Sequence, residues 1–356
     1  MQRESPRLQA NNFDLLRLLF AGTVCLVHVQ TLSGFGQLDF VTRILSAAAA
    51  VKAFFVVSGF LIFMSYERSS SLWTYAGKRI RRIYPAYVTV VMLCALGLVT
   101  VSSARIAEYF SFAWVKYVVA NLLFLNFLQP TLPGVFATHH IPEVNGALWT
   151  LKIEVMFYLS VPLFAYLIRR LSPLSVILVT YCASIAYAML MTAFAERTGA
   201  EYYVQLARQL PGQLSYFMAG AFFYYFLPWF ERRSTSCVVA AVVALVVNTV
   251  HPLPFLEPFA LATMVAFFGL FLYCGNFGKY GDFSYGVYIL HVPIIQLLLG
   301  SRWFDESPWW LLGTTIGLTM ICAVAMWHLV EKRFLFRGSH YLVAVSTDGG
   351  SATGRK

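Results

Sequence analysis

The chain has 356 residues, of which 59% are hydrophobic, 17% aromatic and only 12% charged. A soluble domain carries about 25% charged residues, so this composition excludes a water-soluble globular protein of this size. The net charge of +10 is not a nucleic-acid signature, because the basic residues lie in short loops between apolar stretches. The composition predicts an all-α, polytopic bundle of transmembrane helices, with the lipid bilayer as its main partner.

Apolar stretches long enough to cross about 30 Å of hydrocarbon recur along the chain. The first begins near Phe13, and because it contains Asp14 and Arg17 and lacks a small-residue cleavage site, we interpret it as a retained helix. Nine further candidate spans lie near residues 44–64, 84–103, 148–168, 174–195, 210–230, 237–250, 257–275, 283–300 and 309–330. A weaker stretch at 114–128 is predicted to be re-entrant or to lie along the outer surface.

Basic clusters, which mark cytoplasmic loops, orient these spans. They lie in loop 65–83, at 169–170, at 232–233, at Lys279 and at 332–337. Placing them inside with both termini requires an even number of crossings, and ten crossings satisfy this if 114–128 does not span. If that stretch does span, one basic cluster falls on the wrong side. We expect a cytoplasmic tail of residues 1–12, a membrane domain of 13–337 and a disordered cytoplasmic tail of 338–356, in the cytoplasmic (inner) membrane.

The six cysteines argue against a metal centre. All lie in apolar stretches and no two form a C-x-x-C pair. Neither a disulfide framework nor a zinc site is indicated, and we expect no metal cofactor.

Ionisable residues inside spans are functional candidates, because each costs about 2.5–3.5 kcal/mol at a helix centre. Arg17 and His28 share one face of the first span, eleven residues and roughly 16 Å apart. The alternative is a packing histidine and a snorkelling arginine, and the isolated pair does not decide between them. On the second span, Ser58 and Gly59 allow close approach of a ligand or, as the motif alone favours, of another helix.

Four further groups stand out. Arg79 and Arg82 lie one helical turn apart and can bind a phosphate, although their spacing alone favours an orientation signal that contacts anionic lipid. Glu154 needs a cationic partner, for which Arg17, His28 and Lys152 are candidates. The stripe formed by Ser284, Tyr288 and His291 should face the bundle interior, for catalysis or for interhelical hydrogen bonding. Glu331 is interpreted as the member of an end-of-helix ion pair.

Taken in chain order, these segments resemble acyltransferase family 3, whose integral membrane enzymes include the O-antigen, capsule and nodulation-factor O-acetyltransferases. The family's first span has an Arg and a His separated by ten residues, as Arg17 and His28 are. Its second-span signature F-F-x-x-S-G-F is similar to F-F-V-V-S-G-F, and its cytoplasmic R-x-x-R is similar to R-I-R-R at 79–82.

Three later motifs extend the resemblance over roughly 13–337. The family's W-S-L-x-x-E-x-x-F-Y-L helix is similar to L-W-T-L-K-I-E-V-M-F-Y-L, with Thr150 in place of the usual Ser and an unusual Lys152. Its S-Y-x-x-Y-L-x-H-x-P helix is similar to S-Y-G-V-Y-I-L-H-V-P. V-E-K-R resembles the closing motif without its customary Pro.

The resemblance implies an O-acyltransferase that uses a cytoplasmic acyl-CoA as donor, usually acetyl-CoA. The acceptor it implies is a hydroxyl of a surface polysaccharide or of its lipid-linked oligosaccharide precursor. The site residues it implies are His28, Arg17 and Glu154 for catalysis, Arg79, Arg82, Ser58 and Gly59 for the donor, and Trp149, Ser284, Tyr288 and His291 for the substrate. His28 would act as a general base or be transiently acylated, and both remain open. The chain is expected to work alone or with separate glycan-assembly proteins.

Two other classes fit polar groups inside a helix bundle. A transporter or flippase would use them as a permeation path. A non-catalytic scaffold of a glycan-assembly complex would use them for packing. Consumption of labelled acetyl-CoA distinguishes the enzyme from both.

Overall fold

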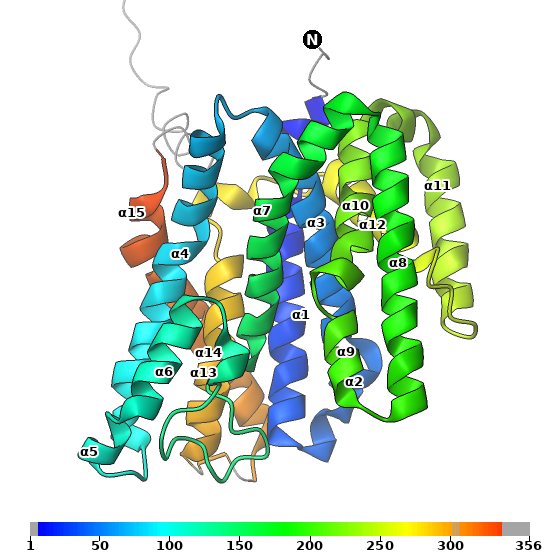
Figure 1. The fold of residues 1–356 in the computed structure, drawn as a ribbon. Coiled ribbons are helices and arrows are strands. Elements are labelled where there is room, and N and C mark those ends of the chain that lie inside the picture. Colours follow the sequence, from blue (N-terminus) through cyan, green and yellow to red (C-terminus); the bar gives the residue numbers. More distant parts are fainter. Residues whose placement is uncertain (1–5, 302, 305, 337–356) are drawn as a thin grey trace, which may run out of the picture. The chain divides into compact units, whose positions relative to one another are not determined.

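The computed structural model describes residues 6–301, 303–304 and 306–336, and its regular elements over these ranges are helices (Figure 1). Residues 1–5 of the expected N-terminal tail and the whole expected tail of 338–356 lie outside the described residues. Six helical stretches are long and apolar enough to cross a membrane: Phe13–Ser33, Gly36–Glu67, Leu72–Val101, Gly146–Arg170, Pro173–Thr198 and Pro308–Phe334. The protein is therefore a multi-pass membrane protein, and the predicted fold class is confirmed.

Each of the ten expected spans contains a helix. They are α1 (Phe13–Ser33), α3 (Ala47–Glu67), α4 (Leu72–Gly97), α7 (Trp149–Arg170), α8 (Pro173–Thr198), α10 (Leu210–Tyr225), α11 (Leu227–Asn248), α12 (Glu257–Leu270), α13 (Ser284–Gly300) and α14 (Pro308–Met326). The weaker stretch contains α6 (Phe112–Leu122), whose 11 residues extend about 16 Å, half the hydrocarbon thickness. Shorter helices are α2 (Asp39–Ile44), α5 (Ile106–Tyr109), α9 (Glu201–Ala207) and α15 (Lys332–Phe334).

The chain forms two compact units that are interleaved in sequence. The first unit contains the described residues up to Leu16, with Ala48–Ala76 and Ile153–Asn276. The second unit contains Arg17–Ala47, Gly77–Lys152 and the described residues from Phe277 onward. Four of the five boundaries fall within helices, in α1, α3, α4 and α7, so single helices contribute to both units.

The first unit is built on a close crossing of α3 and α10. Gly59 of α3 lies against the carbonyl of Phe217, and Gly220 of α10 lies against the carbonyl of Val56, so that a Cβ atom at either glycine would overlap backbone. Beside this crossing the rings of Phe157 and Phe217 stack with centroids 4.2 Å apart. Small residues that let two backbones approach are the usual basis of helix packing in membranes. Gly59 therefore has the packing role that its sequence motif favoured.

Asn12 ties the start of the chain to the end of α12 in the same unit. Its Nδ2 donates to the carbonyls of Phe268, at 3.0 Å, and of Leu272, and its Oδ1 accepts from the backbone N–H of Cys274 at 3.0 Å. The last carbonyls of a helix have no intrahelical donor. The buried Asn12 side chain supplies it for α12.

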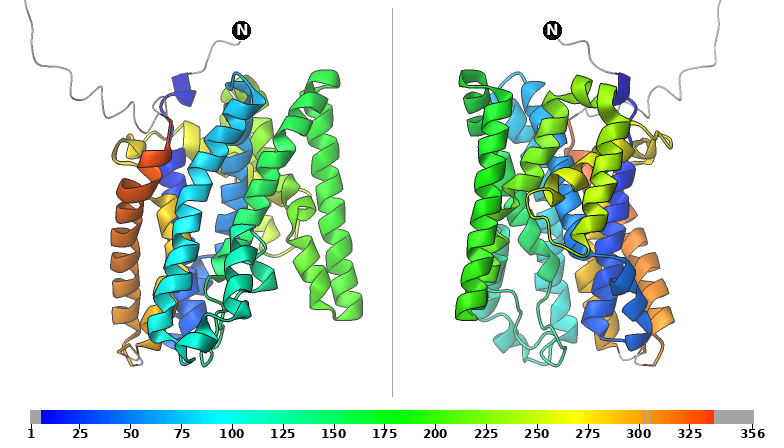
Figure 2. Two further views of the ribbon diagram at one scale, coloured as in Figure 1. Left: turned by 60° about the vertical axis from the view of Figure 1, so that its left-hand side comes forward. Right: turned by 90° about the vertical axis from the view of Figure 1, so that its right-hand side faces the viewer.

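The second unit is centred on α13, which packs beside α14 (Figure 2). Gly286 makes this possible, because a Cβ atom there would be 2.9 Å from the Cα atom of Ala323 on α14. At the far end of α13, Ile295 forms a fully buried apolar cluster with Val29 of α1 and Leu311 of α14. These contacts fix α1, α13 and α14 as the elements that carry the polar residues described next.

Candidate active site

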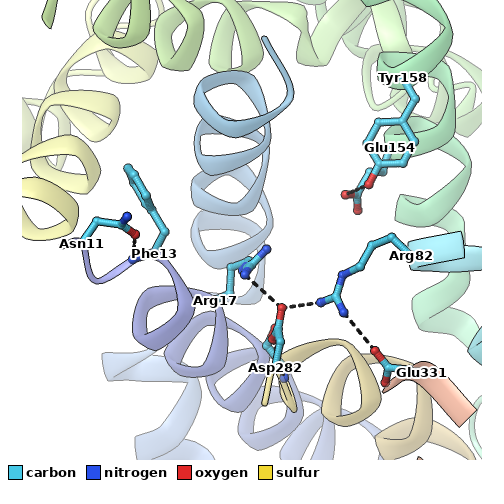
Figure 3. Close-up of polar contacts among 9 residues, drawn as sticks. Asn11, Phe13, Arg17, Arg82, Glu154, Tyr158, Asp282 and Glu331 are labelled. Carbon is cyan, nitrogen blue, oxygen red and sulfur yellow. Dashed lines mark hydrogen bonds and ion pairs between the residues drawn. The ribbon is translucent and has the colours of Figure 1, made fainter. Parts of the chain in front are cut away.

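Four charged side chains from four segments meet in the second unit. Asp282, just before α13, accepts from Arg17 of α1 at 2.9 Å and from Arg82 of α4, and Arg82 also pairs with Glu331 at 3.1 Å (Figure 3). The two carboxylate side chains are 1% and 2% exposed, so they are shielded from water. Two positive and two negative groups leave no net charge, as burial requires. We call these four residues the charge cluster.

The local sequence G-D-F-S holds Asp282 in place. Its Oδ1 accepts from the backbone N–H of Ser284, at 3.1 Å, and from the Ser284 hydroxyl. A carboxylate just before the first turn of α13 is also stabilised by the helix dipole. Gly281 has φ +119°, and a Cβ atom there would overlap the Trp327 indole, so the turn before Asp282 requires glycine. Ser284, predicted to lie on a substrate-facing stripe, thus orients a carboxylate.

Glu331 lies in a short π-helix, Trp327–Glu331, that follows α14. Such π-turns are rare and occur frequently at functional sites. Here the turn brings the Glu331 carboxylate to Arg82, and the predicted end-of-helix ion pair is confirmed. Asp282 was not among the predicted site residues, because it precedes the apolar span.

The second polar group of this unit is a pair of histidines. His28 of α1 and His291 of α13 face each other with His28 Nδ1 2.8 Å from His291 Nε2, and their rings stack 5.0 Å apart. His291 is fully buried, and its Nδ1 lies 3.1 Å from the carbonyl oxygen of Val287. Both histidines were predicted as site residues, and the structure joins them in one hydrogen bond.

The carbonyl of Val287 sets the protonation of the neutral pair. A carbonyl only accepts, so His291 carries its proton on Nδ1 and its Nε2 must accept. His28 must then donate from Nδ1, which leaves the lone pair of His28 on Nε2. This assignment follows from the hydrogen-bond network rather than from observed hydrogens. His28 Nε2 is therefore the basic atom of the pair.

The remaining predicted residues are divided between the two units. Tyr288, one residue after Val287 on α13, shares a hydrogen bond of 2.6 Å with Thr150 of α7, and Trp149 beside it is half-buried. In the first unit, Glu154 accepts from Tyr158 at 2.6 Å, and Ser58 precedes the packing glycine of α3 (Figure 3).

Residues 11–328 match the protein family described as "Acyltransferase domain". The chain belongs to acyltransferase family 3. Among its relatives, nodulation protein 10 of Rhizobium leguminosarum bv. viciae is 26% identical over 352 residues, which cover 90% of this chain and 92% of the relative. The O-acetyl transferase of Shigella phage Sf6 is 27% identical over 344 residues, which cover 93% of this chain and 98% of the relative. No solved structure matches this chain.

This member of acyltransferase family 3 is thus an enzyme of the membrane that uses an acyl donor. An acyl transfer needs an atom that removes the proton of the accepting nucleophile and groups that hold the donor. The histidine pair is suited to removing that proton. The arginines of the charge cluster, with Arg79 one turn away on α4, are suited to holding the donor. Within the described ranges, no three His, Cys, Asp or Glu side chains are grouped as metal ligands.

Proposed function

We propose that this membrane acyltransferase moves an acetyl group from cytoplasmic acetyl-CoA to a hydroxyl of a cell-surface glycan or of its lipid-linked precursor. The support for acetyl transfer to oxygen is the likeness, over nearly the whole chain, to a phage protein named as an O-acetyl transferase. The support for a cytoplasmic donor is the excess of Lys and Arg in the loops on one side. On this proposal the protein lies in the cytoplasmic membrane with both termini inside.

The observation that carries the proposal is the hydrogen bond between His28 and His291. A sugar hydroxyl is a poor nucleophile until a base begins to remove its proton. His28 Nε2, with its lone pair fixed by the tautomer, is that base. The hydroxyl oxygen bonds to the thioester carbonyl carbon while its proton passes to Nε2. The carbon–sulfur bond then breaks, and the CoA thiolate takes the proton back from His28.

His291 supports the charge that develops during this step. When His28 becomes an imidazolium, its Nδ1–H···Nε2 bond to His291 becomes charge-assisted and therefore stronger. The same contact holds the His28 ring in one orientation, as the third group of a catalytic triad does. We assign His28 the role of general base and His291 that of its positioning partner.

Donor binding is proposed for the basic side chains of α1 and α4. Arg82 and Arg79 present guanidinium groups that can bind the phosphates of CoA, with Arg17 contributing from the charge cluster. Thioester attack also creates an oxyanion that fixed donors stabilise. Glu154, Ser58 and Trp149 stay proposals for the same reaction, carried by their family motifs. The bilayer and the glycan acceptor complete the partners, together with separate glycan-assembly proteins.

The test compares His28→Ala with wild type in proteoliposomes that contain the lipid fraction of the host membrane and radiolabelled acetyl-CoA. General acid–base groups contribute about 10²–10⁴-fold, so His28→Ala should lose transfer by at least about 10²-fold at matched protein amount. His140→Ala, which alters an exposed loop histidine, is the matched control and should keep full activity. Retained transfer in His28→Ala would assign the base to another residue.

The same preparation separates a base from a covalent intermediate. Without the lipid fraction, a base leaves no label on the protein, whereas an acylated histidine would retain it. A transporter or scaffold would consume no acetyl-CoA in either condition. Label found on His28 by mass spectrometry would replace general-base catalysis by acyl-histidine catalysis.

A further inference from the structure

A proline interrupts the hydrogen bonding of α13 close to the histidine pair. Pro293 lies inside this helix and has no backbone N–H, so the carbonyl of Ile289, four residues earlier, lacks its intrahelical donor. Ile289 is fully buried, which leaves no access for bulk water. A buried carbonyl without a donor costs about 1–3 kcal/mol. Some other group must therefore satisfy it.

That group is the side chain of Asn145. Its Nδ2 donates to the Ile289 carbonyl at 2.8 Å, and the side chain is almost fully buried. Because the carbonyl can only accept, the amide cannot be turned round, and Oδ1 is fixed as its other end. Oδ1 is buried and accepts no hydrogen bond from the described residues. Oδ1 of Asn145 is thus left without a hydrogen bond within the part of the chain that the structure describes, while Nδ2 donates to the backbone of α13.

The turn of α13 that Asn145 contacts is the turn that carries His291. His291 lies between Ile289 and Pro293, and the carbonyl that fixes its tautomer belongs to Val287. A second contact reaches the same turn, because Thr150 bonds to the hydroxyl of Tyr288. The segment 145–150 is thereby attached to two successive residues of α13, Tyr288 and Ile289, which lie three and two residues before His291.

We propose that Asn145 is a positioning residue for acyl transfer. By supplying the hydrogen bond that Pro293 withholds, it fixes the turn Val287–His291 and with it the contact between His291 and His28. This inference rests on the proposed role of His28, but on no particular acceptor. A misplacement of about 1 Å in a catalytic group can cost about 10²-fold in rate.

The expected effect of Asn145→Ala is a fall in kcat of about 10–100-fold. The KM for acetyl-CoA should stay within about two-fold, because the charge cluster lies at the other end of this stretch of α13, around Asp282. The control is Asn121→Ala, which removes another buried asparagine, whose amide donates to the backbone carbonyls of Tyr117 and Gln129. It should lower stability without changing kcat.

A rescue experiment tests the stated cause. Pro293→Ala returns a backbone N–H to α13 that can bond to the Ile289 carbonyl, so Asn145→Ala should recover most of its activity in this background. If Asn145→Ala alone fails to fold, the double variant is still expected to fold and to transfer. A folded double variant that remains as impaired as Asn145→Ala would overturn the proposal.

Non-additivity gives a second, independent readout. If Asn145 acts through His291, then Asn145→Ala should add no further loss of kcat to His291→Ala. A further measurement, the rate at which diethyl pyrocarbonate modifies His28, requires no glycan acceptor. Measured relative to the modification of His140 in the same molecule, this rate should fall equally in Asn145→Ala and in His291→Ala. Additive losses, or a His28 rate unchanged in Asn145→Ala alone, would refute positioning.

The two proposals fail in different ways. If His28→Ala retains transfer, the proposed base is wrong, whatever Asn145 does. If His28→Ala is inactive and Asn145→Ala has the kcat of wild type, the base stands and only the inference about Asn145 is wrong.

Discussion

The charge cluster predicts an unusually large loss of stability from a nearly isosteric substitution, Asp282→Asn. The new side chain keeps an oxygen for the backbone N–H and hydroxyl of Ser284, but it presents a neutral amide to Arg17 and Arg82. The charge of the cluster changes from zero to +1. The perturbation therefore isolates the electrostatic part of the contact from its shape.

The magnitude follows from the number of buried contacts. Breaking a buried ion pair by removing one partner costs about 3–5 kcal/mol, and Asp282 serves two guanidinium groups, so we expect the upper part of this range. Glu331→Gln also removes one buried charge, but it breaks a single ion pair, the one with Arg82, so we expect the lower part of the same range. The expected order is therefore a larger loss for Asp282→Asn than for Glu331→Gln.

The free energy of unfolding can be measured by titrating the purified protein with SDS in mixed micelles. Asp39→Asn is the matched control, because the carboxylate of Asp39 accepts from a neutral amide, that of Gln30, at 2.9 Å. It should cost about 0.5–1.5 kcal/mol. If Asp282→Asn costs no more than the control, or less than Glu331→Gln, the ionic account of the cluster is wrong.

Two other predictions concern helix packing and donor binding. Gly220→Ala forces a Cβ atom into the backbone of α3 and should prevent accumulation of folded protein in the membrane. Its control is Gly22→Ala, which has open space around the new Cβ atom and should accumulate as wild type does. A quantitative immunoblot of membranes measures both amounts. Arg82→Lys keeps the charge but loses the planar guanidinium fork. In the proteoliposome assay the apparent KM for acetyl-CoA should therefore rise more than the apparent KM for the acceptor. An unchanged KM for acetyl-CoA would leave Arg82 a structural role only.

The helices could be predicted from the sequence because hydrocarbon tolerates little else. A span must satisfy its own backbone hydrogen bonds, so each long apolar stretch has to be helical. The same cost argument marked Arg17, His28 and His291, since polar groups are expensive within a span. It could not show that His28 and His291 meet, because a helical period reveals which face is polar but not which helix lies opposite.

The two residues that the sequence argument missed have a common cause. Asp282 and Asn145 lie just outside apolar stretches, next to the first turns of α13 and α7, where polar residues are ordinary. The motif S-Y-G-V-Y-I-L-H-V-P does contain one indirect indication of Asn145. Pro293, in a helix otherwise suited to span the membrane, predicts an unsatisfied carbonyl at Ile289 and hence a donor from elsewhere in the chain. Only the structure identifies that donor as Asn145.

The order of the contacts between α1 and α13 decides how α6 relates to the membrane. Arg17 pairs with Asp282, and His28, further along α1, pairs with His291, further along α13. Because both contacts advance in the same direction, the two helices run parallel, and an odd number of crossings must lie between them. With one crossing for each of the ten helices, α13 is the ninth and seven lie between, as parity requires. If α6 also crossed, eight would lie between and the helices would be antiparallel. The contacts therefore favour ten crossings, in which α6 does not span the membrane.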